Sequence, residues 1–294
     1  MRGCHHVVAF GAALVLLCGA PAQGKPAPKA DKKAAKPSWD IEQPKVASRQ
    51  QAIDVQTGTW MSLDVSPDGK KIVFDLLGDL YVMPITGGRA KALTHSLAWD
   101  MQPRFSPDGR WIAFTSDQGG GDNIWVMPAA GGKAKQVTKE DVRLVTSPAW
   151  SPDSEYIVAR KHFTSRRSIG SGEMWLYHRS GRGKGVQMTK KKTEQKDEGE
   201  PVFSPDRRYL YYSRDVSSGT TFRYGKNSAE GIYAIERLDT TTGRVVRVAG
   251  GPGGAARPTP SPDGRWLAFV RRIEGRTALV VQNLRHGAEE TLLH

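Results

Sequence analysis

The sequence predicts an all-β protein, a β-propeller built from five four-stranded antiparallel blades. Short segments with alternating apolar residues recur along the chain, and helical periodicity is absent after the leader. A Ser-Pro-Asp tripeptide occurs five times, at intervals of 40, 45, 53 and 57 residues, a spacing typical of propeller blades or solenoid repeats. The five copies begin at Ser66, Ser106, Ser151, Ser204 and Ser261.

Each tripeptide predicts a tight turn that closes a hairpin. Serine favours the first position of a type I turn, proline presets φ at the second, aspartate suits the third, and glycine accepts the left-handed backbone that follows. Ser154 and Arg207 replace this glycine in two copies, at a cost on the order of 1 kcal/mol each. We interpret the repeated residues as structural turn residues and not as a row of acid catalysts. They are Ser66, Pro67, Asp68, Gly69, Ser106, Pro107, Asp108, Gly109, Ser151, Pro152, Asp153, Ser204, Pro205, Asp206, Ser261, Pro262, Asp263 and Gly264.

Each repeat continues as a four-stranded antiparallel blade. A short strand such as "MQPRF" precedes the turn, and an alternating strand such as "RWIAFTS" follows it, with Ile112 and Phe114 on the face opposite Trp111 and Ala113. A third strand such as "NIWVMPA" leads through the glycine turn "AGGK" to a fourth, "AKQVT". This order predicts a β-propeller domain over residues 51–294. Its blades are expected around residues 59–95, 99–138, 145–189, 199–248 and 256–294.

The last blade raises the question of how the ring closes. Propellers usually complete the terminal blade with a strand from the other end of the chain, and "AIDVQTG", residues 52–58, has the alternation for that role. The sequence leaves two alternatives, five blades that close through this segment or further blades that follow His294. We favour the second, an incomplete ring.

The first 22 residues have the features of a secretory signal peptide. Arg2 precedes an uncharged apolar run that is shorter than the roughly 20 residues needed to span a bilayer. Cys4 and Cys18 both lie in this leader, so we expect no disulfide in the exported chain. Residues 23–50, rich in lysine, alanine and proline, predict a disordered basic linker. We expect an exported protein, periplasmic or secreted, without a membrane span after cleavage.

The net charge of +13 does not by itself indicate binding to nucleic acid. Part of this charge lies in the linker, and the sequence has no basic helical stripe or aromatic RNA-binding motif. We therefore expect no nucleic-acid partner.

Two long connections mark the candidate binding face. They follow the second strands of the third and fourth blades, at residues 161–172 and 213–231, and should emerge on one face of the ring. Their basic residues suit a carboxylate-bearing ligand or an acidic partner surface; alternatively, the loops pack only on each other or on another domain. The nearby charged stretch, residues 189–200, predicts a solvated connection between blades. The candidate residues are Arg160, Lys161, His162, Arg166, Arg167, Arg214, Arg223, Tyr224 and Lys226.

Longer phrases of the sequence resemble known families. The repeat in "SPDGKKIVF" and "LYVMPITGG" is similar to that of TolB-type propellers. The phrases "WMSLDVSPDGKKIVFDLLGDLYVMPITGG" and "GGPGGAARPTPSPDGRWLAFVRR" resemble the amino-terminal propeller of large exported amidohydrolases. The similarity covers about residues 50–294. It implies that a metal-dependent amidohydrolase domain, holding a divalent zinc-like ion, follows the propeller.

The catalytic residues of that family are not carried over to this chain. Such enzymes bind their ions through clustered histidine and aspartate side chains that start from a His-x-His pair, which this sequence lacks. We expect no catalytic residue, metal site or cofactor in these residues. After the leader the histidines are scattered, at His95, His162, His178, His286 and His294.

The sequence thus predicts a non-catalytic propeller module of an exported metal-dependent amidohydrolase. Its partner would be the downstream catalytic domain, on which it would dock and restrict substrate access. One alternative is a stand-alone TolB-type platform that binds an envelope protein. Another is the propeller of a serine peptidase of the prolyl-oligopeptidase kind.

Overall fold

The computed structural model describes residues 40–41, 43, 46–47, 49, 51–163, 171–221 and 225–293. All of these belong to the compact unit Trp39–His294. The predicted signal peptide, residues 1–22, lies outside the described residues, as does most of the predicted linker.

Five four-stranded antiparallel sheets follow one another in a ring over these residues, which confirms the predicted β-propeller. In each sheet the strands are hydrogen-bonded in chain order. The first sheet comprises β1 (Leu63–Val65), β2 (Lys71–Leu76), β3 (Asp79–Pro84) and β4 (Lys91–Ala92). The second comprises β5 (Asp100–Phe105), β6 (Trp111–Ser116), β7 (Asn123–Pro128) and β8 (Lys135–Gln136). The third comprises β9 (Leu144–Trp150), β10 (Tyr156–Phe163), β11 (Ser171–His178) and β12 (Val186–Gln187).

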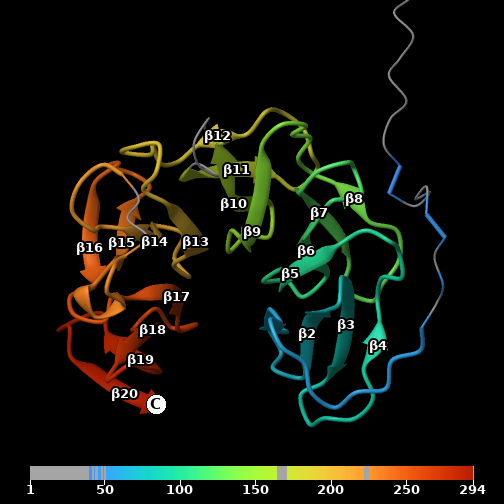
Figure 1. Cartoon of the computed structure of the whole chain (residues 1–294), viewed down its shortest axis with the longest axis horizontal. Coiled ribbons are helices and arrows are strands. Elements are labelled where there is room, and N and C mark those ends of the chain that lie inside the picture. Colours follow the sequence, from blue (N-terminus) through green and yellow to red (C-terminus); the bar gives the residue numbers. More distant parts are fainter. Residues whose placement is uncertain are drawn as a thin grey trace, which may run out of the picture. The chain divides into compact units, whose positions relative to one another are not determined.

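The last two sheets have longer outer strands. The fourth comprises β13 (Glu198–Phe203), β14 (Tyr209–Asp215), β15 (Tyr233–Asp239) and β16 (Val245–Ala249). The fifth comprises β17 (Ala256–Pro260), β18 (Trp266–Ile273), β19 (Arg276–Asn283) and β20 (Glu289–Leu293). A short 3₁₀ helix, η1 (Ser228–Glu230), precedes β15. Figure 1 shows β5, β9, β13 and β17 toward the middle of the ring and the fourth strands toward its outside.

Buried apolar clusters fill the seams between consecutive sheets. In each of the first four sheets, one residue of the second strand clusters with two residues of the second strand of the next sheet. Val73 thus clusters with Ile112 and Phe114, and Tyr211 with Leu267 and Phe269. The same positions recur because alternate residues of a strand face opposite sides of the sheet.

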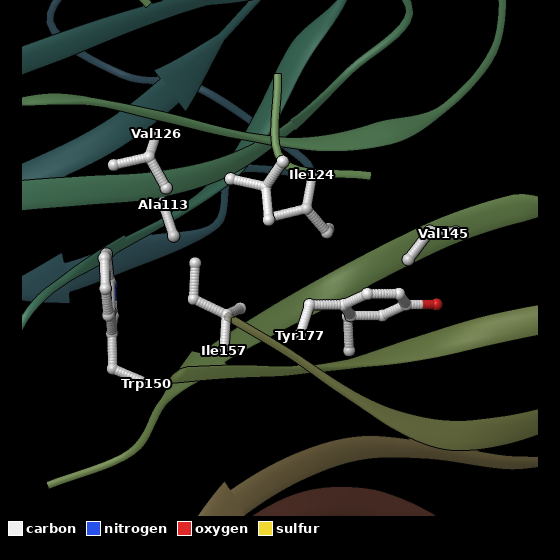
Figure 2. Close-up of a cluster of buried hydrophobic side chains, with 9 residues drawn as sticks. Ala113, Ile124, Val126, Val145, Trp150, Ile157 and Tyr177 are labelled. Atoms are coloured by element: carbon white, nitrogen blue, oxygen red, sulfur yellow. The ribbon is translucent and has the colours of Figure 1, made fainter. Parts of the chain in front are cut away.

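Figure 2 shows this packing at the seam between the second and third sheets. Ala113 and Val126 come from the second sheet, and Ile157 and Tyr177 come from the third. All four are at least nine-tenths buried. Burial of a large apolar side chain stabilises a fold by roughly 1.5–3 kcal/mol, so these clusters stabilise the contacts between consecutive sheets.

The segment proposed to close the ring forms no strand. Residues 52–58 are exposed, and each of the five sheets obtains its four strands from its own repeat. The alternative in which this segment supplies a closing strand is therefore not supported. The physical reason is local, because β20 already occupies the outer edge of the fifth sheet, where it pairs with β19.

Candidate functional site

The five repeated turns share one hydrogen-bond arrangement. In each copy the serine hydroxyl donates to the aspartate Oδ1, and the N–H five residues after the serine donates to the same hydroxyl oxygen. For Ser261 these distances are 2.6 Å to Asp263 and 2.9 Å from Trp266. The hydroxyl of Ser261, with Arg265, lowers the pKa of Asp263 to about 2. The carboxylates are thus held ionised by the turns.

The structure divides the candidate binding residues into three groups. Arg160, Lys161 and His162 lie on β10, and Arg214 lies on β14. Lys226 lies in the connection before η1. The others fall outside the described residues, so their role remains a prediction; they are Arg166, Arg167, Arg223 and Tyr224.

The described basic side chains are bound by carboxylates of the same chain. Arg160 pairs with Asp197 at 2.6 Å, and Lys226 pairs with Asp215 at 2.7 Å. Lys161 pairs with Glu140, and its ammonium also lies 4.4 Å from the centre of the Trp175 ring. These groups are therefore largely neutralised before any ligand arrives. His162 is also buried, with 6% of its surface exposed.

Arg214 forms the most buried of these ion pairs. Its guanidinium bonds to both Glu198 and Glu236, and all three residues are at least nine-tenths buried. The hydroxyl of Tyr212 donates to Glu236 at 3.1 Å. Burial raises the pKa of Glu198, and the positive charge of Arg214 opposes this shift. Arg214 thus holds two carboxylates that would be costly to bury alone.

A small pocket of about 190 Å³ opens beside this triad. Its lining includes Lys192, Lys196, Glu198, Arg214 and Asp215. The Oε2 atom of Glu198 is buried and has no hydrogen-bond partner, although Oε1 accepts two bonds from Arg214. One buried oxygen of Glu198 beside the pocket thus lacks a hydrogen-bond partner.

The prediction of a solvated connection at residues 189–200 is correct only in part, because Lys190, Lys192 and Glu194 are exposed but other charges of the stretch are buried. Lys196 and Glu198 are 6% and 1% exposed. Lys196 donates to Ser217 and pairs with Asp215 at 3.4 Å. Lys196 and Glu198 are internal and, like Asp197, they pair with opposite charges on β10 or β14, which composition alone does not reveal.

A second set of polar residues lies on the inner strands and was not predicted from the sequence. Gln102, Ser147, Glu200 and Arg257 each precede a proline, and each has φ between 54° and 59°. A β-bulge shifts the strand register at all four positions. Such a backbone costs on the order of 1–3 kcal/mol per residue. The signal was present in the sequence, since a proline stands three residues before the turn serine in these four repeats.

Side chains of the preceding sheet accept hydrogen bonds from the backbone at several of these bulges. The N–H of Gln102 donates to Asp75 at 2.6 Å, and the N–H of Ser147 donates to the Gln102 side chain at 2.7 Å. The N–H of Arg257 donates to Glu200 at 2.9 Å. Side chain to backbone hydrogen bonds therefore link the inner strands β5 and β9, and likewise β13 and β17.

The described residues contain no group of three or more histidine, cysteine, aspartate or glutamate side chains placed to hold a metal ion. The described residues therefore offer no ligand set for the zinc-like ion that the amidohydrolase resemblance implies. No helix in this part of the chain is long and apolar enough to cross a membrane.

Comparisons with known proteins find relatives among propellers and peptidases. The model of the Tricorn protease N-terminal beta propeller domain matches residues 62–225. Uncharacterized peptidase YuxL of Bacillus subtilis is 30% identical over 198 residues, which are 66% of this chain and 25% of that protein. Tricorn protease homolog 1 of Streptomyces coelicolor is 31% identical over 91 residues, 31% of this chain and 8% of that protein. The chain spans a quarter or less of the length of both relatives.

Solved structures share the fold. Putative TolB from Agrobacterium tumefaciens superposes with a TM-score of 0.63 and 21% identity, over 78% of this chain and 79% of that one. TolB from Acinetobacter baumannii gives a TM-score of 0.59 and 20% identity, over 79% of this chain and 52% of that one.

Proposed function

This chain belongs to the family of Tricorn protease N-terminal β-propeller domains, and we propose that it is a non-catalytic module of an exported hydrolase acting on C–N bonds. The main support is the match to two relatives named as a peptidase and a protease, of which the chain corresponds to only a part. In this proposal the module docks on a catalytic domain and restricts access to it. The amino-terminal leader supports export.

The internal pairing of the candidate charges also favours a scaffold role. Arg160, Lys161 and Arg214 are each bound by carboxylates of the same chain. A general acid, base or nucleophile needs a group that can reach the substrate. The polar groups of the loop face thus support a rigid docking surface.

Two kinds of catalytic domain suit this proposal. The resemblance of residues 50–294 to amidohydrolase propellers favours a metal-dependent amidohydrolase, with its divalent ion held by the catalytic domain. The named relatives favour a peptidase. A third candidate, a stand-alone platform that binds an envelope protein, is supported by the likeness of fold to TolB structures.

The coding sequence after His294 separates these candidates. A His-x-His motif followed by further metal ligands supports the amidohydrolase, and a Gly-x-Ser-x-Gly motif supports the serine peptidase. A stop codon supports the stand-alone platform and contradicts the module proposal.

A second experiment tests the division of labour directly. The purified 294-residue chain is incubated with amide and peptide substrates, with and without added zinc. We expect no hydrolysis above that of buffer. Zinc-dependent turnover that copurifies with the chain would contradict a non-catalytic role.

A further inference from the structure

A cavity lies apart from the candidate loops, on the side of the fourth and fifth sheets where the repeated turns are found. Its volume is about 590 Å³, and it lies at the turn end of the seam between the fourth and fifth sheets. It is bounded by the turns at Ser204–Asp206 and Asp263–Arg265 and by the β19–β20 turn. Within each sheet the long loops emerge at the opposite end of the strands.

At the same turn position, side chains form polar contacts across the seam between the second and third sheets and across the seam between the third and fourth sheets. Arg207 of the fourth sheet pairs with Asp153 of the third at 2.8 Å. The Ser154 hydroxyl accepts a hydrogen bond from the N–H of Asp108 in the second sheet at 3.1 Å. In the fifth sheet the equivalent residue is Gly264, which has no side chain to reach back to Asp206. At this turn position, no described side chain of the fifth sheet bonds to the fourth sheet.

A half-buried guanidinium lies in this cavity without a carboxylate partner. Arg237 lies 4.2 Å from the centre of the Tyr209 ring, and Tyr211 lines the same cavity. Within the described part of the chain no aspartate or glutamate forms an ion pair with Arg237. An arginine stacked on an aromatic ring keeps its fork of donors oriented for an incoming anion.

The remaining charges of the cavity favour an anion as well. Asp263 is already bound by Ser261 and Arg265, and Asp206 accepts from the Ser204 hydroxyl and the Arg208 N–H. Arg285 and His286 stand on the β19–β20 turn at the rim. Leu284 and the Tyr209 ring supply apolar surface in the same cavity.

We propose that this cavity binds a small organic carboxylate, with the carboxylate on Arg237 and the apolar part of the ligand on Tyr209 and Leu284. Arginine binds carboxylates through two parallel hydrogen bonds, and the cavity volume is in the range of small-molecule sites. Arg285 adds a second positive charge at the entrance. The proposal holds for any of the catalytic partners considered above, since it rests on the propeller alone.

The test uses two small-molecule probes that carry the same phenylalanine side chain and differ in the presence of a carboxylate. N-acetyl-L-phenylalanine carries a carboxylate, and N-acetyl-L-phenylalaninamide does not. Binding of each to the full chain is measured by isothermal titration calorimetry and by ligand-observed NMR. We expect saturable binding of the acid and none of the amide over the same concentrations.

Variants locate the binding. Arg237→Gln is expected to weaken acid binding by about tenfold or more, because it removes a charge-assisted hydrogen bond. Arg285→Gln, which changes only an exposed side chain, is expected to weaken it by a few fold. Arg276→Gln is the matched control, an exposed arginine at the other end of β19, and should leave binding unchanged. Thermal unfolding checks that each variant is folded.

Several results would overturn the proposal. They are absence of acid binding, equal binding of acid and amide, and acid binding that is unchanged in a folded Arg237→Gln variant. Inorganic phosphate serves as a competitor. If phosphate displaces the acid at equal concentration, the cavity binds anions generally and the assignment to organic carboxylates is wrong.

Discussion

The guanidinium of Arg207 lies 2.8 Å from the carboxylate of Asp153, across the seam between the third and fourth sheets. Arg207 occupies a turn position that glycine fills in three of the five repeats, and its φ of 65° matches the 68° of Gly264. The left-handed backbone is costly for a residue with a Cβ. The ion pair gives a structural reason for accepting that cost, because it adds a polar link between the two sheets at their turn end.

This relationship predicts different effects for two substitutions of Arg207. Arg207→Ala keeps the strained backbone and loses the ion pair, so its free energy of unfolding should fall by about 0.5–1 kcal/mol. Arg207→Gly loses the pair but relieves the strain, so it should be about 1 kcal/mol more stable than the alanine variant. Urea denaturation measures both. Equal stability of the two variants would show that the backbone at this turn is not strained.

Arg214 should be much more important to stability than any exposed arginine. Arg214→Met leaves Glu198 and Glu236 buried without a counter-charge, so the free energy of unfolding should fall by about 3–5 kcal/mol near neutral pH. The pKa of Glu198, already raised by burial, should rise further once the arginine is gone. A carboxyl with a raised folded pKa loses stability as pH rises through that pKa, so the deficit should be larger at pH 8 than at pH 5.

Two controls accompany this measurement. Arg276→Met removes an exposed arginine and should change stability little. Adding Glu198→Gln and Glu236→Gln to Arg214→Met should recover much of the loss, because neutral amides are less costly to bury than ions. A deficit that is independent of pH and is not recovered by these amides would mean that lost packing, and not charge, accounts for the effect.

The repeats predicted the sheets well because turn and strand signals are local. The strand expected in "RWIAFTS" is found as β6, Trp111–Ser116, and the turn residues have the same hydrogen bonds in all five copies. The charged partners of Arg214 were not predicted, because the pairing depends on a bulge. Phe203 lies opposite Leu210, so an unbroken register would place Glu198 opposite Asp215. The shift after Gly199 places Glu198 opposite Arg214 instead.

The same reasoning explains why the candidate loop face was only partly predictable. The basic residues were visible in the sequence, but the carboxylates that bind them lie on other strands or connections. Arg160 and Asp197, for example, are 37 residues apart. Pairing over such separations follows from the order of the sheets and their bulges, and composition carries no signal for it.

Asp100 predicts a pH dependence of stability. It is 4% exposed on β5, and burial raises its pKa to about 6, although the hydroxyls of Ser116 and Thr94 bond to it. Because the folded pKa exceeds the unfolded value of about 3.9, the contribution of Asp100 is fully present below pH 4 and is lost as pH rises through 6. The loss should amount to roughly 3 kcal/mol at most.

The measurement compares the wild type with Asp100→Asn by urea denaturation from pH 4 to pH 8. The asparagine cannot ionise, so the wild type should lose stability relative to the variant as pH rises. Asp263→Asn is the contrasting variant: the pKa of Asp263 is lowered to about 2, so its contribution should stay nearly constant from pH 4 to pH 8 and be lost only when the measurement is extended below pH 4. Parallel pH profiles for wild type and Asp100→Asn would rule out the buried, protonated aspartate.

Gly253 and Gly275 form a matched pair for the packing of the fifth sheet. Their φ values are 77° and 79°, so a side chain would be similarly strained at both. A Cβ at Gly253 would lie 1.9 Å from the carbonyl oxygen of Arg272, whereas a Cβ at Gly275 would meet no atom within 4 Å. Gly275→Ala should therefore cost about 1 kcal/mol. Gly253→Ala should cost at least about 3 kcal/mol, because relief of the clash would break its hydrogen bonds with Ala229 and Arg272. Urea denaturation of both variants measures the difference, and similar losses would mean that the segment between the fourth and fifth sheets can move away from β18 at little cost.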